Sequence, residues 1–156
     1  MFQSVLFVCL GNICRSPLAE GAFRTEVAKR RLAIVTESAG TAAYHIGEKP
    51  DPRAIATAKR KGVDISSHRG QQVKPSDFKR FDHIVAMDAD NLANLKRIQP
   101  EDAKARLSLM LDWVEGRQGQ SVEDPYYGEE DGFEITWADV TAGAKGLADH
   151  MSQKAD

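Results

Sequence analysis

The sequence has few cysteines, no surplus of positive charge and no long apolar run, and each absence excludes a class of protein. Its two cysteines, Cys9 and Cys14, lie too close in sequence to form the disulfide framework of a small secreted domain. The formal net charge is −2 and the pI is near 6.1, so the chain lacks the overall basicity of a nucleic-acid-binding protein. No apolar stretch approaches the roughly 20 residues that span a bilayer.

We expect no secretory leader, since no charged segment followed by an apolar one precedes the first predicted strand. No internal repeat, low-complexity segment or linker rich in Pro, Gly or Ser divides the 156 residues. We therefore expect a single domain over residues 1–156, in a reducing cytoplasm, with no nucleic-acid or membrane partner.

Apolar residues recur with periods that alternate between strand and helix. The pattern predicts strands at residues 4–8, 32–38, 83–87 and 106–110, and helices at residues 17–31, 52–61, 75–78, 91–98 and 133–153. Gly62 is expected to end the second helix, whereas Gly143 and Gly146 weaken the last helical pattern. Such an alternation predicts an α/β fold with a four-stranded parallel sheet flanked by helices. Ligands of these sheets bind beyond the carboxyl ends of the strands.

The end of the first strand carries the most informative stretch of the chain. Starting at Cys9, it reads Cys-Leu-Gly-Asn-Ile-Cys-Arg-Ser and leads into a predicted helix. Five residues between Cys9 and Arg15 let backbone N–H groups curl around an anion, and Gly11 would supply a positive φ. Arg15 offers a planar fork of donors that matches two phosphate oxygens. We expect Ser16 to cap the helix and Pro17 to begin it, so that the helix dipole points at this phosphate-binding loop.

A cysteine at the base of such a loop is a candidate nucleophile. A helix N-terminus and a neighbouring cation both favour a thiolate, so we predict that Cys9 is largely ionised at neutral pH. A lone cysteine at the end of a strand is more often a small buried hydrophobe. The glycine, arginine and serine in register with Cys9 favour the catalytic interpretation.

Two separated motifs resemble those of the low-molecular-weight protein tyrosine phosphatases. The stretch CLGNICRSPLAE, residues 9–20, matches the family's Cys, five residues, Arg and Ser or Thr, and Asp124-Pro125-Tyr126-Tyr127 matches its late element. The resemblance implies hydrolysis of tyrosine-phosphorylated proteins and small aryl phosphates through a phosphocysteine. Cys9 would be the nucleophile, Arg15 would bind phosphate and stabilise the transition state, and Asp124 would act as general acid and then as base. No metal or other cofactor is expected, because Arg15 and the loop N–H groups carry the phosphate charge.

The resemblance also implies supporting roles around the loop. The phosphate-binding positions would be Leu10, Gly11, Asn12, Ile13, Cys14 and Ser16. Ser38 and His68 would join Asn12 and Ser16 in a hydrogen-bond network that orients the loop. Cys14 would form a reversible, protective disulfide with Cys9, although a small side chain packed under the loop is an equally good interpretation of Cys14.

Three tyrosines, Tyr44, Tyr126 and Tyr127, match family positions that wall a deep cleft. Aromatic walls suit a phenyl ring, and depth excludes the shorter phosphoserine, whereas loop aromatics are otherwise often small packing anchors. Family members are phosphorylated on the tyrosine pair or dimerise through it. The resemblance therefore leaves open a tyrosine kinase as a partner and a state of monomer or weak dimer.

The remaining polar candidates have simpler interpretations. Asp88, just past the third predicted strand, is expected either to orient Arg15 or to cap the following helix. His45, His83 and His150 are expected to be solvated surface residues.

Other functions fit less of the sequence. Thioredoxin-coupled arsenate reductases need further cysteines, and the chain has none after Cys14. Protein arginine phosphatases have Thr in the phosphate-binding loop at the position where this chain has Ile13. The larger apolar side chain of Ile13 favours an aryl ester as the substrate. A phosphocysteine carrier would not need an acid such as Asp124. The intact set of Cys9, Arg15 and Asp124 argues against a non-catalytic phosphotyrosine binder.

Overall fold

The four predicted strands form one parallel sheet. The computed structural model describes residues 3–128 and 131–154. The strands are β1 (Gln3–Cys9), β2 (Ile34–Gly40), β3 (His83–Ala86) and β4 (Arg106–Leu109), in the spatial order β2-β1-β3-β4. All three neighbouring pairs are parallel, and Cys9 at the end of β1 lies opposite Gly40 at the end of β2. The predicted fold class is confirmed.

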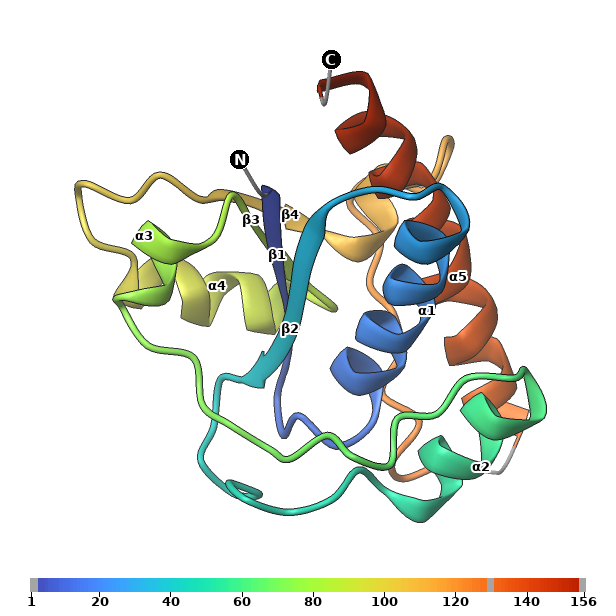
Figure 1. The fold of residues 1–156 in the computed structure, drawn as a ribbon. Helices are drawn as coiled ribbons and strands as arrows, with labels where there is room; N and C mark the ends of the chain where they lie inside the picture. The colour runs from blue at the N-terminus through green and yellow to red at the C-terminus, as the bar shows by residue number, and fades with distance from the viewer. Residues whose placement is uncertain (1–2, 129–130, 155–156) are drawn as a thin grey trace.

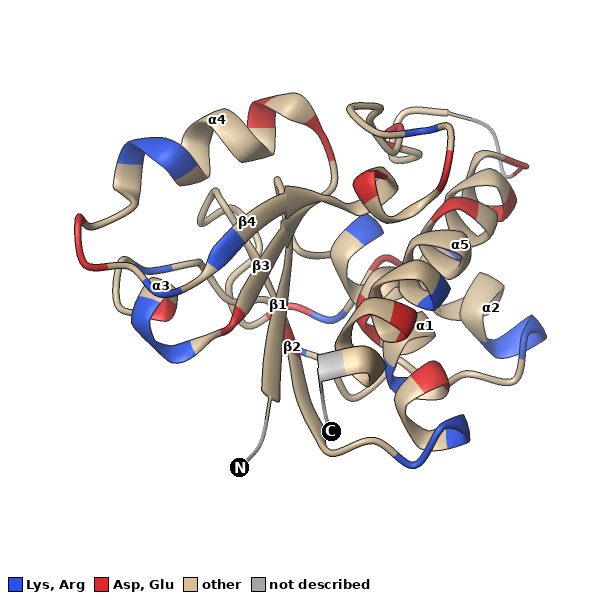
Figure 2. Ribbon diagram, turned by 90° about the horizontal axis from the view of Figure 1, so that it is seen from above, with Lys and Arg blue, Asp and Glu red and all other residues tan. Residues whose placement is uncertain are grey.

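Helices cover both faces of the sheet. They are α1 (Arg15–Lys29), α2 (Pro52–Arg60), α3 (Asp77–Arg80), α4 (Ala89–Ile98) and α5 (Asp131–Lys154), with a 3₁₀ turn, η1 (Met110–Trp113), after β4. Figure 1 shows α1, α2 and α5 on one side of the strands, with α3 and α4 on the other. In Figure 2, basic and acidic residues are interspersed over the helices and loops around the sheet. None of the helices in the described ranges is both long and apolar enough to cross a bilayer.

The central strand β1 supplies side chains to two apolar cores. Val5 and Phe7 belong to the core under α1 and α5, whereas Leu6 and Val8 belong to the core under α3 and α4. This division follows from the two-residue period of a strand, which turns successive side chains to opposite faces. Because β1 is buried on both faces and hydrogen-bonded on both edges, the loop that follows it starts from a rigid support.

The last helix is continuous despite its two glycines. A Cβ atom at Gly146 would lie 1.8 Å from the carbonyl oxygen of Trp113, and one at Gly143 would lie 2.8 Å from that of Met110. Both distances are far below any van der Waals contact. The glycines therefore let α5 pack directly on the backbone of η1, a long-range reason that the helical pattern does not contain.

Several predicted boundaries differ from the observed ones. β2 begins two residues later than expected, because Arg31 adopts a φ of 56° and the N–H of Leu32 donates to the carbonyl of Val27 at 3.0 Å, which prolongs the turn after α1. α3 lies at Asp77–Arg80 rather than 75–78, since the Asp77 carboxylate accepts from the N–H of Lys74 at 2.8 Å and closes a turn there. β4 ends at Leu109, where η1 begins.

The prediction that the histidines are solvated surface residues is wrong for His83 and only partly right for His150. His83 is buried at the start of β3, and its ring lies edge-on to those of Trp113 and His150, with centroids 5.7 Å apart in each pair. His150 is half-buried and its centroid is 4.8 Å from that of Trp113. Aromatic packing on η1 and α5 therefore holds both imidazoles at the end of the sheet away from Cys9.

Candidate active site

The loop between β1 and α1 forms the floor of the site. Cys9 is the last residue of β1, Arg15 is the first residue of α1, and both side chains are buried. The Cys9 Sγ atom lies 3.0 Å from Ser16 Oγ and accepts from the backbone N–H of Asn12 at 3.3 Å. The Asn12 N–H thus donates to the sulfur, and the Ser16 hydroxyl is close enough to donate to a thiolate there.

Two local predictions about this loop are wrong. The left-handed residue is Asn12, with a φ of 59°, and not Gly11. Gly11 is needed for space, because a Cβ atom there would lie 3.0 Å from Cδ2 of His45. Ser16 is not the N-cap of α1, since the helix begins at Arg15 after Cys14 and has no side-chain cap. The Ser16 hydroxyl is directed to Cys9 and Asn12 instead, so the helix N-terminus stays open toward the loop.

A buried polar network holds Asn12 in its left-handed conformation. Its Nδ2 donates to Ser16 Oγ at 2.8 Å and to Ser38 Oγ at 3.1 Å. Its Oδ1 accepts from the backbone N–H of Gln71 at 3.0 Å and lies 3.0 Å from Nε2 of His68. The structure therefore brings together the four residues that the resemblance grouped, from β1–α1, from β2 and from the loop after α2.

Glu20 belongs to this network, although sequence reasoning assigned it no role. Its Oε1 accepts from Ser38 Oγ at 2.6 Å and lies 3.6 Å from Nδ1 of His68, and its carboxylate also pairs with Arg24. Burial lowers the pKa of His68, while the nearby Glu20 carboxylate opposes that shift. The available signal was the position of Glu20 one helical turn after Ser16 on an otherwise buried face of α1.

Arg15 is held by three acceptors from two segments. Its Nη1 donates to Asp88 Oδ2 at 2.6 Å and to the carbonyl of Val122 at 3.0 Å, and its Nη2 lies 3.5 Å from Asp124 Oδ2. Although burial opposes its charge, the Cys9 sulfur and then the two carboxylates raise the pKa of Arg15 further. The guanidinium is therefore permanently charged and its orientation is restricted.

Asp88 fulfils both of the roles that were considered for it. While Oδ2 binds Arg15, Oδ1 accepts from the backbone N–H of Asn91 at 2.7 Å and caps α4. One carboxylate thus joins the start of α4 to the phosphate-binding loop.

Asp124 lies on the segment that leads toward α5. Its Oδ1 accepts from the N–H of Tyr126 at 3.0 Å, and its side chain is 36% exposed. A carboxylate beside the buried Arg15 and open to solvent can exchange protons both with a bound ester and with water.

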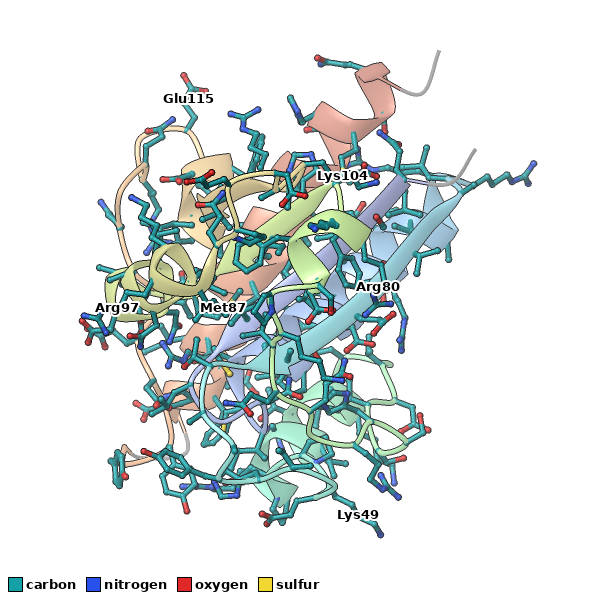
Figure 3. The ribbon with its side chains drawn as sticks, turned by 90° about the vertical axis from the view of Figure 1, so that its left-hand side faces the viewer. Lys49, Arg80, Met87, Arg97, Lys104 and Glu115 are labelled. Atoms are coloured by element: carbon teal, nitrogen blue, oxygen red, sulfur yellow. The ribbon has the colours of Figure 1, made fainter. Side chains whose placement is uncertain are left out.

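These groups meet in one pocket at the carboxyl ends of the strands. Its lining residues are Cys9, Leu10, Gly11, Ile13, Cys14, Arg15, Tyr44, His45, Asp124, Tyr126 and Tyr127. Tyr126 and Tyr127 pack edge to face, with ring centroids 4.9 Å apart, while Tyr44 and Tyr127 are 73% and 92% exposed. The tyrosines therefore form a rim above a polar floor. Figure 3 shows Lys49, on the segment that follows β2, projecting away from the protein.

The second cysteine differs chemically from the first. Cys14 is buried, and burial followed by the negative charges of Asp51 and Cys9 raises the pKa of its thiol well above the ordinary value. Both cysteines are free thiols. No group of three His, Cys, Asp or Glu side chains within residues 3–128 and 131–154 is arranged to hold a metal ion.

A buried thiol at the base of an anion-binding loop, beside a fixed arginine and an accessible carboxylate, defines the class of cysteine-dependent phosphate ester hydrolases. Residues 4–156 match the family model described as low molecular weight phosphotyrosine protein phosphatase, so the chain belongs to that family. It is 46% identical, over 132 residues, to the low molecular weight phosphotyrosine protein phosphatase of Schizosaccharomyces pombe, covering 83% of this chain and 84% of that one.

Solved structures agree with this assignment. A protein tyrosine phosphatase from Entamoeba histolytica, with Hepes in its active site, superposes with a TM-score of 0.92 at 36% identity and 99% coverage of both chains. A Drosophila arginine phosphatase superposes with a TM-score of 0.89 at 30% identity, covering 94% of this chain and 96% of that one. The fold is thus common to neighbours named for two different phosphorylated residues.

Proposed function

We propose that this protein hydrolyses phosphotyrosine in proteins, and small aryl phosphates, in two steps through a phosphocysteine. In the first step the Cys9 thiolate attacks phosphorus, the S–P bond forms and the P–O bond to the tyrosyl oxygen breaks. Protonated Asp124 gives its proton to that oxygen, so that tyrosine leaves as a neutral phenol. In the second step water attacks phosphorus, Asp124 takes its proton, and the S–P bond breaks to release phosphate and regenerate the thiolate.

The observation that carries this proposal is the convergence of Cys9, Arg15 and Asp124 on one pocket. Arg15 supplies fixed donors where charge builds on the equatorial phosphate oxygens, and the N–H groups of the loop add to them. Asp88 and the Val122 carbonyl hold the guanidinium in place before substrate binds. Catalysis in this site rests on charge stabilisation by groups that need not reorganise during the reaction.

The aromatic rim supports an aryl ester as the substrate. Tyr44, Tyr126 and Tyr127 surround the pocket, and a phenyl ring has the flat apolar faces that such side chains contact well. Ile13 adds an apolar wall on the loop itself. Phosphoarginine, in which phosphorus is bonded to a guanidino nitrogen, is the second candidate, because the arginine phosphatase named above shares the fold. The apolar Ile13 favours tyrosine over a charged guanidino group.

Phosphate release from a phosphotyrosine peptide in excess EDTA tests the proposal. We expect metal-independent turnover that is lost in Cys9→Ser, with a phosphoarginine peptide a poor substrate. A preference for phosphoarginine would overturn the assigned substrate. Uptake of a single phosphate without turnover would overturn hydrolysis in favour of a carrier.

Three further assignments belong to the same proposal. Cys14, buried in the same loop, would close a disulfide with Cys9 when an oxidant removes two electrons from the two thiols, which would protect Cys9 from irreversible oxidation. A reversible disulfide fits a protein of the reducing cytoplasm. The protein would act as a monomer or weak dimer. The exposed Tyr127 and the adjacent Tyr126 would be accessible to a tyrosine kinase.

A further inference from the structure

Arg53 is not one of the three proposed catalytic residues, but it binds segments that adjoin them. It is the second residue of α2, whose N-cap is Asp51. The guanidinium pairs with the Asp51 carboxylate through two bonds, Nε to Oδ1 at 3.0 Å and Nη2 to Oδ2 at 2.8 Å. The backbone N–H of Arg53 also donates to Oδ1 at 2.8 Å. A planar fork held at both ends has little freedom to rotate.

The same guanidinium also binds residues 124–128, the acid segment, which begins with the proposed acid Asp124. Its Nη2 donates to the carbonyl of Tyr126 at 3.1 Å, two residues after Asp124. Its central carbon lies over the ring of Tyr126 at 5.5 Å from the centroid and over that of Phe133, on α5, at 4.8 Å. Both distances are within the range of cation–π attraction. Arg53 is thus packed between the acid segment and α5.

Asp51 completes the connection on the side of the nucleophile. Its backbone N–H donates to the carbonyl of Ile13, in the phosphate-binding loop, at 2.8 Å. The Asp51 side chain is 8% exposed and that of Arg53 is 37% exposed, so the pair is partly buried. The Asp51–Arg53 pair therefore joins the loop that holds Cys9 to the segment that holds Asp124.

The acid segment has few other attachments. Hydrogen bonds within the segment are local, from the N–H of Tyr126 to Asp124 Oδ1 and from the N–H of Gly128 to the carbonyl of Pro125. In the part of the chain that the structure describes, the bond from Arg53 is the one hydrogen bond that ties the backbone of residues 124–128 to another element. Asp124 is held from one side by Arg15, 3.5 Å from its carboxylate, and the backbone that follows it is held by Arg53.

We propose that Arg53, clamped on Asp51, is a positioning residue that holds the Asp124 segment over the phosphate-binding loop for proton transfer to the leaving group. This inference rests on the proposed role of Asp124 as general acid. Misplacement of a catalytic group by about 1 Å costs up to ~100-fold in rate. Loss of Arg53 should therefore mimic part of the loss of Asp124, and only where an acid is needed.

The dependence on the leaving group separates positioning from folding. Aryl phosphates whose phenols are strong acids leave without help, whereas a phenol with a pKa near that of tyrosine, about 10, needs a proton. The experiment measures kcat/KM, which reports formation of the phosphocysteine, for a series of aryl phosphates from nitrophenyl to tyrosyl. The variants are Arg53→Gln, Asp124→Asn, the double variant and Arg60→Gln.

Arg60→Gln is the matched control. Arg60 lies on the same helix and pairs with Glu134 of α5 at 2.9 Å, but it makes no bond to the acid segment. Arg53→Gln removes the ion pair with Asp51 and Arg60→Gln removes the one with Glu134, and thermal unfolding of both variants measures the stability that each change costs. Only Arg53→Gln should alter the leaving-group dependence.

We expect Arg53→Gln to lower kcat/KM for the tyrosyl ester by about 10- to 100-fold, with a smaller loss for nitrophenyl esters. Added to Asp124→Asn, it should cost less than about twofold more, since both changes remove the same function. An equal loss for every ester, or a full additional loss in the double variant, would overturn the inference while leaving the acid assignment intact. If Asp124→Asn itself gave no loss that grew with the pKa of the phenol, the proposed acid would be wrong.

Discussion

Asn12 shows how much of this site depends on single side chains. A left-handed φ is tolerated by Asn at low cost, and its amide can also donate twice and accept twice. All four of those bonding capacities are used, toward Ser16, Ser38, Gln71 and His68. Glycine could adopt the backbone conformation but would remove all four of these hydrogen bonds.

The half-buried imidazole of that network, His68, should make stability depend on pH. Burial lowers its pKa in the folded state below the unfolded value of about 6.5. The unfolded chain therefore binds the proton more readily, so the contribution of His68 is fully present above pH 6.5 and is lost as pH falls toward the folded pKa. Urea unfolding between pH 8 and 5 should show a smaller acid-side loss for His68→Gln than for the parent. Parallel pH profiles would contradict this.

We predict that alkylation is selective for one of the two cysteines. Burial and the charge of Asp51 raise the pKa of Cys14, so this thiol stays protonated at neutral pH. Iodoacetate at pH 7 should therefore modify Cys9 and leave Cys14 intact, because only thiolates react appreciably. Peptide mass spectrometry after brief treatment measures the site, with Cys9→Ser as the control that should remain unmodified. Prior modification of Cys14 in the parent would show that the loop exposes the wrong sulfur.

At the scale of elements, the contact of α5 with η1 explains a break in the helical pattern. Figure 1 shows α5 running beside α1, and the glycine face of α5 lies on the carbonyls of η1. A helix can approach a backbone this closely only where it carries no side chain. His83, Trp113 and His150 pack against one another beside the same contact.

Two glycine substitutions in this one helix should have opposite effects. In Gly146→Ala the Cβ atom would overlap the Trp113 carbonyl, and we expect a loss of about 2–3 kcal/mol in the free energy of unfolding from overpacking. In Gly132→Ala the nearest atom is Cβ of Pro125 at 3.6 Å, an ordinary contact. That change should be neutral or stabilising by up to ~1 kcal/mol. Chemical denaturation of both variants checks the contrast, and similar losses would mean that helix propensity, not packing, dominates.

Two further contacts fix elements outside the sheet to its strands, one at α3 and one at the start of the acid segment. Arg80 of α3 pairs with Glu37 of β2 at 2.8 Å, and Figure 3 shows Arg80 beside that strand, with Met87 in the interior at the end of β3. Met87 in turn accepts from the N–H of Val122 through its carbonyl at 2.8 Å. The acid segment therefore begins from a strand end that the core already holds.

At the scale of the whole molecule, the site draws on segments that unfold together. Cys9 and Arg15 come from the β1–α1 loop, Asp88 from the end of β3, and Asp124 from the segment before α5. A ligand that binds this assembled site binds only the folded chain. Binding should therefore raise the stability of the entire domain.

Inorganic phosphate should accordingly stabilise the protein against heat. At 100 times its Kd the linkage relation gives about 2.7 kcal/mol at 25 °C, enough to shift Tm by a few degrees in a domain of this size. Differential scanning fluorimetry with rising phosphate measures the shift at fixed ionic strength. Arg15→Gln should abolish it, whereas Arg60→Gln, remote from the pocket, should keep it. A shift retained without Arg15 would mean that phosphate binds elsewhere.

The sequence by itself determined the sheet, the order of its elements and the residues of the phosphate-binding loop. Those features depend on near neighbours: apolar period, turn residues and the spacing from Cys9 to Arg15. The helix cap at Ser16 and the positive φ at Gly11 were mispredicted, although they are local, because Ser16 bonds Cys9 and Asn12 bonds residues distant in sequence. Only the tertiary structure decided that Glu20 supports the loop and that Arg53 reaches Tyr126. These bonds join residues 18 and 73 positions apart, and pairing at such separations depends on how strands and helices pack rather than on any local pattern.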